Sequence, residues 1–382
     1  MINVAIIGIG AISDSHIKAY LQFGERCKIT VLVDKSKEKA QNKIDQYGLD
    51  AIVVDDYTYL KEREDVDLVS ICLPPGLHTE VTCEMLKAGK HVLCEKPLAP
   101  TVEECDIMIQ TAKECGKLLS VVAQNRFKPD VIRVKKLVDS GILGKKHYAF
   151  ASSLWWRGEN YYNLSWRGRW DTEGGGCTLI HGIHHIDLFL WMMGKPKQIT
   201  AEVYNRAHTN SEVEDISLGT VQFEDGSVGS MITSIIHHGE EQRITLDAEH
   251  GSVELPFAIH ASKQLENGFP EDNKEKLEEM QEFCDNIEVL YSAHTGQIDD
   301  MLSAIETGRR PLVTGEDGRL AIELISALYQ SAFLKQPVNL PLTENDPFYT
   351  KAGILKYATK FYEKTVSVDT FSNNEIQVGG TL

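Results

Sequence analysis

A glutamate, a lysine and a proline follow directly after a short apolar run in "HVLCEKP", as Glu95, Lys96 and Pro97. The apolar run predicts a buried strand. Charged side chains at the end of such a strand are unexpected if the segment serves only to pack the core, and they are natural if it takes part in catalysis or binding. A lysine in that place could hydrogen-bond a reacting hydroxyl group and stabilise it as negative charge develops. The alternative is that Glu95 and Lys96 form an ordinary surface ion pair.

A second set of chemical groups lies in "GGGCTLIHGIHHIDL", which contains His181, His184, His185 and Asp187. Spacings of three and four residues allow His181, His184 and Asp187 to share one face of a helix. His184 could act as a general base, because imidazole titrates near neutral pH. His185 is interpreted as a structural histidine. The histidines lack an evident pattern for a third ligand, so we expect no metal there.

A glycine-rich loop follows the first apolar run and consists of Gly8, Ile9, Gly10, Ala11, Ile12 and Ser13. Gly8 permits a tight turn, Gly10 lets the backbone approach a pyrophosphate, and the next helix offers its N-terminal amides. Asp34 ends the second predicted strand, where its carboxylate could bind ribose hydroxyls and repel a 2′-phosphate. This pattern favours NAD as the cofactor, although Lys35 and Lys37 leave NADP possible.

The elements that position these groups fall into two patterns. Residues 1–123 alternate apolar strands with amphipathic helices, which predicts a Rossmann domain whose parallel sheet is covered on both faces. Residues 124–366 add helices and a series of strands joined by short turns, which predicts a second domain with helices and an antiparallel sheet. Residues 367–382 are polar, and we expect a poorly ordered tail.

Composition limits the partners and the compartment. The net charge of −17 argues against nucleic acid and anionic membranes, which require basic surface. No apolar run is long enough to span a membrane, and the first one lacks the features of a signal peptide. The eight cysteines include no CxxC pair and fit free thiols in a reducing compartment, so we expect a cytoplasmic protein.

The stretch "SLWWRGENYYNLSWRGRW" holds four of the five tryptophans together with three arginines. Aromatic faces stack on the apolar face of a sugar ring, while arginines bind hydroxyls or carboxylates. An oligomer interface would also be rich in these residue types. The candidate substrate-binding residues are Trp155, Arg157, Tyr161, Trp166 and Arg167, with Arg126 of "AQNRF" and His181.

The chain resembles the Gfo/Idh/MocA oxidoreductase family over nearly its whole length, through the glycine loop, "AGKHVLCEKPLA", "GGGCTLIHGIHHIDL" and "RRPLVTGEDGRLAIELISALYQSA". The resemblance implies NAD(P)-dependent oxidation or reduction of a secondary hydroxyl on a sugar, an inositol or other polyol, or a related ring. It also implies that Lys96 is the catalytic lysine, that His184 lies near the reacting carbon and that Asp187 supports the site. The resemblance further implies that the Rossmann domain is joined to an α/β domain with a large, mostly antiparallel open sheet, and this sheet is expected to mediate a homodimer or homotetramer. The expected cofactor contacts are Gly8, Gly10, Ala11, Ile12, Asp34, Pro74, His78, Glu95, Lys96 and Pro97.

Two departures from the family pattern leave other functions open. Ile180 stands where many polyol dehydrogenases of the family have a carboxylate or amide, and Pro75 stands where asparagine is usual. One alternative is the oxidation of a glycoside ring that activates cleavage of its glycosidic bond. The other is a non-catalytic regulator that senses a dinucleotide. This alternative stays open because Ile180 replaces the usual carboxylate or amide, although Lys96 and His184 are present.

Overall fold

The computed structural model describes residues 1–369 and 371, which form two compact units. Unit 1 comprises Met1–Gln124 and Tyr291–Ile322, and unit 2 comprises Asn125–Leu290 and the described residues from Glu323 onwards. Most of the tail expected at 367–382 lies outside the described residues.

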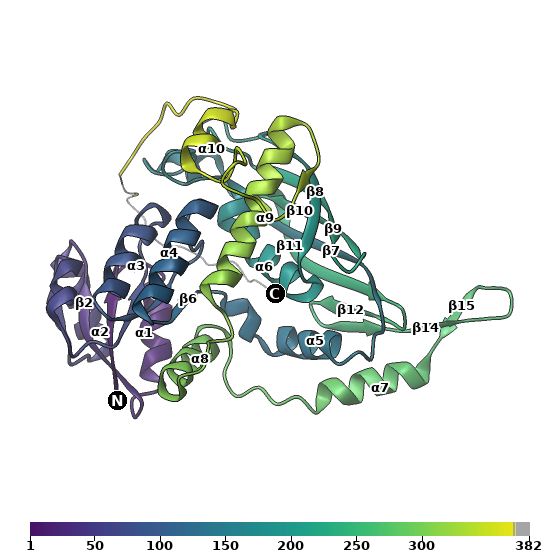
Figure 1. Ribbon diagram of the computed structural model, residues 1–382, viewed down its shortest axis with the longest axis horizontal. Helices are drawn as coiled ribbons and strands as arrows, with labels where there is room; N and C mark the ends of the chain where they lie inside the picture. The colour runs from purple at the N-terminus through teal and green to yellow at the C-terminus, as the bar shows by residue number, and fades with distance from the viewer. Residues whose placement is uncertain (370, 372–382) are drawn as a thin grey trace. The chain divides into compact units, whose positions relative to one another are not determined.

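Unit 1 is built on a six-stranded parallel sheet with the order β3-β2-β1-β4-β5-β6. Figure 1 draws this part of the chain in purple to blue and labels β2 and β6. Because the order reverses at β1, ligands are expected beyond the carboxyl ends of these strands. The predicted Rossmann sheet is confirmed. Its strands are β1 (Ile2–Ile7), β2 (Cys27–Val33), β3 (Ile52–Val54), β4 (Leu68–Ile71), β5 (His91–Cys94) and β6 (Leu119–Val121). Its helices are α1 (Ser13–Leu21), α2 (Lys37–Tyr47), α3 (His78–Lys87), α4 (Val102–Cys115) and α8 (Ala293–Thr307).

Helix α8 belongs to unit 1, whereas the boundaries expected from the sequence place it in the second domain. Its Ile298 and Leu302 are buried in the same apolar core as Ile17 of α1. The side chain of Gln297 accepts a hydrogen bond of 2.9 Å from the backbone amide of Ala123, just beyond β6. An amphipathic pattern shows that a helix has an apolar face but not which sheet covers that face, so the sequence could not place α8.

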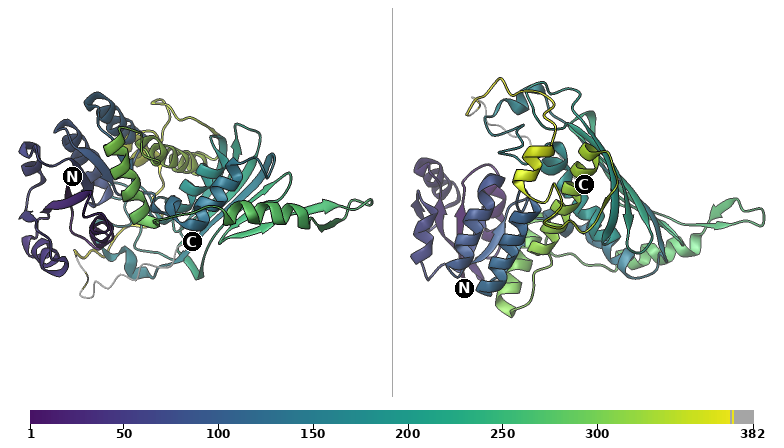
Figure 2. Two further views of the ribbon diagram at one scale, coloured as in Figure 1. Left: turned by 90° about the horizontal axis from the view of Figure 1, so that it is seen from below. Right: turned by 45° about the horizontal axis from the view of Figure 1, so that its top comes forward.

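Unit 2 is built on a large sheet, most of which is drawn in teal in Figure 2. Its eight strands have the order β13-β12-β11-β7-β10-β9-β8-β16. Strands β7 and β10 pair in parallel, and the other pairings described in this sheet are antiparallel. The expected mixed, mostly antiparallel open sheet is therefore confirmed. The strands are β7 (Lys146–Trp156), β8 (Pro196–Tyr204), β9 (Ile216–Phe223), β10 (Val228–Ser234), β11 (Ile236–Ala248), β12 (Ser252–Leu255), β13 (Ala258–His260) and β16 (Val338–Asn339).

Further elements of unit 2 cover or extend this sheet. A separate hairpin comprises β14 (Ser262–Gln264) and β15 (Pro270–Asp272). The helices are α5 (Pro129–Asp139), α6 (Ile183–Met193), α7 (Lys274–Asp285) and α10 (Lys351–Tyr357), while α9 (Gly315–Leu334) contributes its first residues to unit 1 and the rest to unit 2. No helix in the described part of the chain combines the length and apolar character needed to cross a membrane.

The two faces of the large sheet differ in burial. Along β9, buried and exposed residues alternate, as expected for a strand with one covered face. On the covered face, Phe189 of α6 packs on Phe223 of β9, with ring centroids 5.4 Å apart. On the other face Leu218 remains 41% exposed. Unit 2 therefore presents an open sheet surface that carries apolar side chains.

Candidate active site

The glycine-rich loop joins β1 to α1 at the carboxyl end of the unit 1 sheet. Gly8 has a φ of +91°, and a Cβ there would meet the carbonyl oxygen of Cys72 at 2.6 Å, so glycine is required. At Gly10 a Cβ would meet no atom within 4 Å, so the loop is open on that side. Asp34 follows β2 and accepts a hydrogen bond of 2.8 Å from the amide of Ile9. This open glycine cradle, the start of α1 and a neighbouring carboxylate fit the pyrophosphate and ribose of a dinucleotide.

The other loop residues that are expected to contact the cofactor follow strands β1 and β4 in the sequence. Ala11 is exposed and Ile12 is half-buried immediately before α1. Pro74 is exposed and precedes the short 3₁₀ turn Pro75–Leu77 beyond β4. These residues lie in the loops that follow two neighbouring parallel strands, β1 and β4, which is where the sequence predicted ligand contacts.

His78 links the loops that follow β4 and β5. Its Nδ1 and Nε2 atoms each lie 2.8 Å from a backbone carbonyl oxygen, of Pro97 and Leu73 respectively. Burial lowers the pKa of His78, which favours the neutral ring, and a neutral ring donates to one of these carbonyls at a time. Both ring nitrogens therefore face the protein, and His78 positions the loop that carries Lys96.

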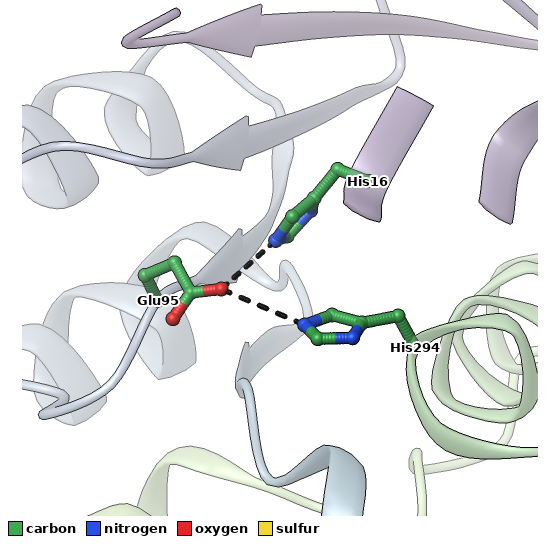
Figure 3. A group of neighbouring side chains, drawn as sticks. All are labelled: His16, Glu95 and His294. Atoms are coloured by element: carbon green, nitrogen blue, oxygen red, sulfur yellow. Dashed lines mark hydrogen bonds and ion pairs between the residues drawn. The ribbon is translucent and has the colours of Figure 1, made fainter. Parts of the chain in front are cut away.

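Glu95 is buried, and one oxygen of its carboxylate faces two histidines (Figure 3). Its Oε1 lies 3.0 Å from Nε2 of His16 and 4.0 Å from Nε2 of His294. Burial alone would raise the pKa of Glu95, but the hydrogen bond and charge of His16 lower it to about 2. Its Oε2 accepts a hydrogen bond of 3.1 Å from the backbone amide of the half-buried Lys96. Glu95 thus holds a buried negative charge directly beside the catalytic lysine expected from the sequence.

In unit 2, the buried carboxylate of Glu214 holds the backbone just before the histidine-rich segment. Glu214 accepts hydrogen bonds of 3.0 Å from the amides of Gly176 and Thr178 and one of 2.8 Å from the hydroxyl of Tyr329. A Cβ at Gly176 would meet the carbonyl oxygen of Glu214 at 2.1 Å, which explains the need for glycine. The glycine run therefore serves close packing against Glu214.

The histidines then divide between two kinds of helix. Residues Thr178–Gly182 form a π-helical turn that contains His181, and α6 begins at Ile183 and contains His184. Both histidines are half-buried, as is Ile180. The spacing of the histidines fits one regular helix, whereas a π-helical turn changes the register of side chains and is frequent at functional sites.

Asp187 and Arg126 form a buried bidentate ion pair. Arg126 Nε and Nη2 lie 2.8 Å and 2.7 Å from the two carboxylate oxygens of Asp187. The guanidinium also lies over the ring of Trp191, 5.0 Å from its centroid. Arg126 is 3% exposed, so its charge is directed at Asp187 within unit 2. This geometry makes Arg126 a partner of Asp187, rather than an exposed arm available to a ligand.

His185 fits the structural role expected for it. Its Nδ1 lies 2.8 Å from the hydroxyl oxygen of the buried Ser153 of β7. Burial, with the positive charge of Lys128, lowers the pKa of His185 to about 3. The ring therefore stays neutral near pH 7 and is ill-suited to accept and release a proton there.

Three of the expected substrate-binding residues form a connected polar chain in unit 2. The hydroxyl of Tyr161 lies 3.5 Å from Nε2 of His181 and accepts a hydrogen bond from Arg167. Arg167 also pairs with the buried carboxylate of Glu173, at 3.3 Å. Burial raises the pKa of Glu173 to about 7, although Arg167 opposes this shift. Gain or loss of a proton by Glu173 can therefore change the charge near His181 around neutral pH.

The other members of the aromatic stretch extend this cluster. The Trp155 ring is buried, and its centroid lies 6.3 Å from that of His181. Arg157 lies over the Trp155 ring at 5.5 Å and pairs with Glu240 at 3.0 Å. The guanidinium of Arg167 lies 4.2 Å from the centroid of the Trp166 ring. The structure thus brings together Trp155, Arg157, Tyr161, Trp166, Arg167 and His181, and pairs Arg126 with Asp187 instead.

A late segment of the chain holds this aromatic stretch in place. The side chain of Asn210 accepts hydrogen bonds from the amides of Thr365 and Val366, at 2.8 Å and 2.9 Å. It also donates to the carbonyl oxygens of Tyr162 and Val366. Ser165 donates its amide to the carbonyl of Val368 at 2.9 Å. Residues 365–368 therefore hold the loop that carries Tyr161 and Arg167 in place through these hydrogen bonds.

Three residues described above were not predicted from the sequence, namely Glu173, His16 and His294. Glu173 directly precedes the glycine run, and its place there is the one signal that could have suggested a role. His16 follows the glycine loop within α1, and His294 lies at the start of α8. Among the described residues, the one group of three or more metal-type ligands consists of these two histidines and Glu95, and none of the α6 histidines belongs to it.

Comparisons with known proteins agree with this fold. The family described as "Oxidoreductase family, NAD-binding Rossmann fold" (GFO_IDH_MocA) matches residues 2–123, and "Oxidoreductase family, C-terminal alpha/beta domain" matches residues 135–340. The chain is 27% identical over 351 residues to D-glucoside 3-dehydrogenase of Escherichia coli K12, which covers 87% of this chain and 95% of that protein.

Two further similarities extend over most of the chain. It is 25% identical over 369 residues to 2,7-anhydro-N-acetylneuraminate hydratase of Mediterraneibacter gnavus, covering 89% of this chain and 96% of that protein. The structure of the WlbA dehydrogenase from Bordetella pertussis, in complex with NADH and UDP-GlcNAcA, matches with a TM-score of 0.76 and 25% identity, over 90% of this chain and 98% of that one. The chain belongs to the Gfo/Idh/MocA oxidoreductase family, and residues 2–123 are its NAD-binding Rossmann domain.

Proposed function

We propose that the protein is an NAD-dependent dehydrogenase that acts on a secondary hydroxyl group of a sugar, a polyol or a sugar derivative. The observation that carries the proposal is the position of Lys96, directly after β5 at the carboxyl end of the NAD-binding sheet. The similarity to D-glucoside 3-dehydrogenase and to a dehydrogenase solved with NADH and UDP-GlcNAcA supports a carbohydrate substrate.

In this mechanism, the bound dinucleotide supplies the acceptor for the hydride that leaves the carbon. His184 accepts the proton of the substrate hydroxyl, because its half-buried imidazole is a residue type that commonly acts as a general base near neutral pH. Lys96 donates a hydrogen bond to the same oxygen and stabilises it as the alkoxide develops. Asp187, held by Arg126, supports the helix that carries His184. The oxygen thus loses its proton to His184 as the carbon loses its hydride.

Supporting roles follow from the contacts of the other predicted residues. Tyr161 and Trp166 are half-buried and offer aromatic faces for a sugar ring, and Arg167 lies between them as a hydrogen-bond donor. His181 contacts the same cluster through Tyr161, and we propose that it binds a substrate hydroxyl. We assign Trp155 and Arg157 to the packing of this surface, and Arg126 to the positioning of Asp187.

We further propose that NAD is preferred over NADP, that the chain forms a homodimer or homotetramer through the open sheet face, and that it works in the cytoplasm. The carboxylate of Asp34 next to the glycine loop supports the first point, because it would repel a 2′-phosphate. The exposed Leu218 on β9 supports the second. The eight cysteines are all free thiols, which fits a reducing compartment.

The proposed function can be tested by following NADH at 340 nm while inositols, hexoses, uronic acids, simple glycosides and nucleotide sugars are offered with NAD. We expect turnover on one of these classes, with kcat lowered about 10²-fold or more in Lys96→Ala and His184→Ala. Lys145→Ala, an exposed lysine elsewhere in unit 2, is the control. Full turnover in both site variants would show that the assigned roles are wrong.

The same assay separates the two alternatives. Release of the aglycone from a glycoside, with no net accumulation of NADH, would indicate ring oxidation that activates bond cleavage. Tight NAD binding without turnover in any class would favour a dinucleotide-sensing regulator. In that case, the apolar Ile180 would be the residue to explain, since it cannot share a proton with His184.

A further inference from the structure

Three metal-type ligands converge inside unit 1 from segments that are distant in the sequence. His16 comes from α1, Glu95 follows β5 and His294 lies in the first turn of α8 (Figure 3). One ligand atom from each residue lies within 4.8 Å of the other two. His16 is fully buried and Glu95 is 5% exposed, so this cluster is not a group of solvated surface charges.

Two of the separations within the cluster, those from Glu95 to each histidine, suit one shared ion. Zinc binds imidazole nitrogen and carboxylate oxygen at about 2.1 Å, so two ligands of one ion lie at most about 4.2 Å apart. The distances from Glu95 Oε1 to Nε2 of His16 and of His294 are 3.0 Å and 4.0 Å. The second distance is too long for a hydrogen bond but lies within the range of two ligands on one ion.

The ring nitrogen of His294 adds an independent observation. Its Nε2 is buried and has no hydrogen-bond partner among the described residues, although Glu95 faces it. Buried polar atoms of this kind are rare and call for an explanation. A cation placed between His294 and Glu95 would satisfy both groups. The His294 side chain keeps 18% of its surface exposed, which gives an ion a route from solvent.

Outer contacts fix two of the three ligands in place. His16 Nδ1 lies 3.3 Å from the hydroxyl oxygen of Ser70, which lies 2.7 Å from the hydroxyl of Tyr20. A histidine that binds a metal through one nitrogen commonly donates from the other to such a partner. Glu95 Oε2 is held by the amide of Lys96, which leaves Oε1 directed at both histidines. The arrangement around the cluster therefore resembles the outer shell of a metal site.

We propose that His16, Glu95 and His294 bind one divalent transition-metal ion, with Zn²⁺ as the best chemical match. Two imidazoles and one carboxylate are common zinc ligands, and they leave a fourth position for water. The bound ion would join α8 to the start of the loop that carries Lys96. Its first role is then to stabilise unit 1 and to hold this loop at the NAD-binding edge.

The proposal can be tested on the full chain, treated with a chelator and then titrated with Zn²⁺ in a calorimeter and with Co²⁺ in a spectrophotometer. We expect one ion per chain, visible-region Co²⁺ bands of a nitrogen and oxygen site, and a higher melting temperature with Zn²⁺. His294→Gln should weaken binding at least ten-fold and abolish the thermal shift. His260→Gln is the matched control, because His260 is exposed and faces Glu254 at 3.6 Å.

Other results would overturn the proposal. Equal affinity in the wild type and His294→Gln would place the ion elsewhere, and no binding at micromolar Zn²⁺ would exclude the site. A sulfur-to-cobalt charge-transfer band would place the metal on thiols, of which Cys72 is next to His16. If His294→Gln does not fold, the stoichiometry and the Co²⁺ spectrum of the wild type still test whether one ion binds to nitrogen and oxygen ligands. None of these measurements requires a substrate, so their outcome is independent of the proposed dehydrogenase activity.

Discussion

The carboxylate of Asp34 accepts a hydrogen bond from the backbone amide of Ile9, with Oδ2 and N 2.8 Å apart. Its other oxygen accepts a hydrogen bond from the amide of Ser36 at the same distance, two residues further along the chain. The side chain is therefore held in one orientation beside the glycine loop before any ligand arrives. Pre-orientation of this kind lowers the ordering cost of binding ribose hydroxyls.

Replacing Asp34 by asparagine should shift cofactor preference away from NAD. Asparagine keeps an acceptor but removes the charge, and hydrogen bonds to charged groups contribute about 1.5–3 kcal/mol. We expect NAD binding to weaken about ten-fold or more, while NADP binding improves relative to NAD. Calorimetric titration with both dinucleotides measures the ratio. Asp45→Asn, on the exposed side of α2, should leave the ratio unchanged. An unchanged ratio in Asp34→Asn would remove Asp34 from the cofactor site.

Glu173 should make the stability of the protein depend on pH near neutrality. Burial raises its pKa from an ordinary 4.5 to about 7, so the folded state binds this proton more tightly than the unfolded state. The resulting stabilisation is complete below about pH 4.5 and is lost as pH rises through 7. Glu173→Gln cannot titrate. Its unfolding free energy relative to the wild type should therefore rise between pH 4.5 and 8, by up to about 3 kcal/mol.

Denaturant unfolding at a series of pH values measures this difference. Glu279→Gln is a suitable control, because Glu279 is exposed on α7 and pairs with Lys276. Parallel pH profiles for the wild type and Glu173→Gln would contradict a raised pKa. Because Glu173 reaches His181 through Arg167 and Tyr161, the pH dependence of KM should also change in this variant.

The NAD-binding edge could be predicted from the sequence because its signals are local. Gly8 lies between a strand and a helix, and Asp34 directly follows the second strand, so apolar runs and glycines are enough to place both. The position of Lys96 after β5 follows from the same reasoning. Strand ends in a parallel sheet gather at one edge whatever the tertiary details are.

The rest of the site depends on packing that no local pattern reveals. His16 and His294 meet at Glu95 because α8 packs on α1, and the sequence does not show which sheet α8 covers. The pKa of Glu173 is raised by burial, which is a property of the folded chain. The spacing of the histidines suggested a regular helix, and the π-helical turn at Thr178–Gly182 changes their register.

Asn210 should control the order of the aromatic loop. It is 5% exposed, and its side chain bonds the backbones of Tyr162, Thr365 and Val366. Asn210→Ala would leave several backbone groups without partners, at about 1–3 kcal/mol for each one that stays buried. We expect faster proteolysis within residues 157–170 and a KM raised about ten-fold with little change in kcat.

Limited proteolysis read by mass spectrometry, together with steady-state kinetics on the substrate found at 340 nm, measures both effects. Asn286→Ala is the control, since Asn286 is exposed at the end of α7 and bonds only its own helix in the described structure. Protection of the loop equal to that of the wild type would show that other contacts hold it, such as that of Ser165 with Val368.

A charge on the open face of the large sheet should dissociate the proposed oligomer. Leu218 points outward from β9 and is 41% exposed in the single chain, so burying it between copies would be favourable and burying a carboxylate there would not. Leu218→Glu should therefore move the protein to a smaller species in sedimentation velocity. Leu265→Glu is a matched control, because Leu265 has the same exposed fraction but lies beside the β14 hairpin strand. If Leu265→Glu dissociates the assembly and Leu218→Glu does not, the hairpin rather than the sheet face joins the copies.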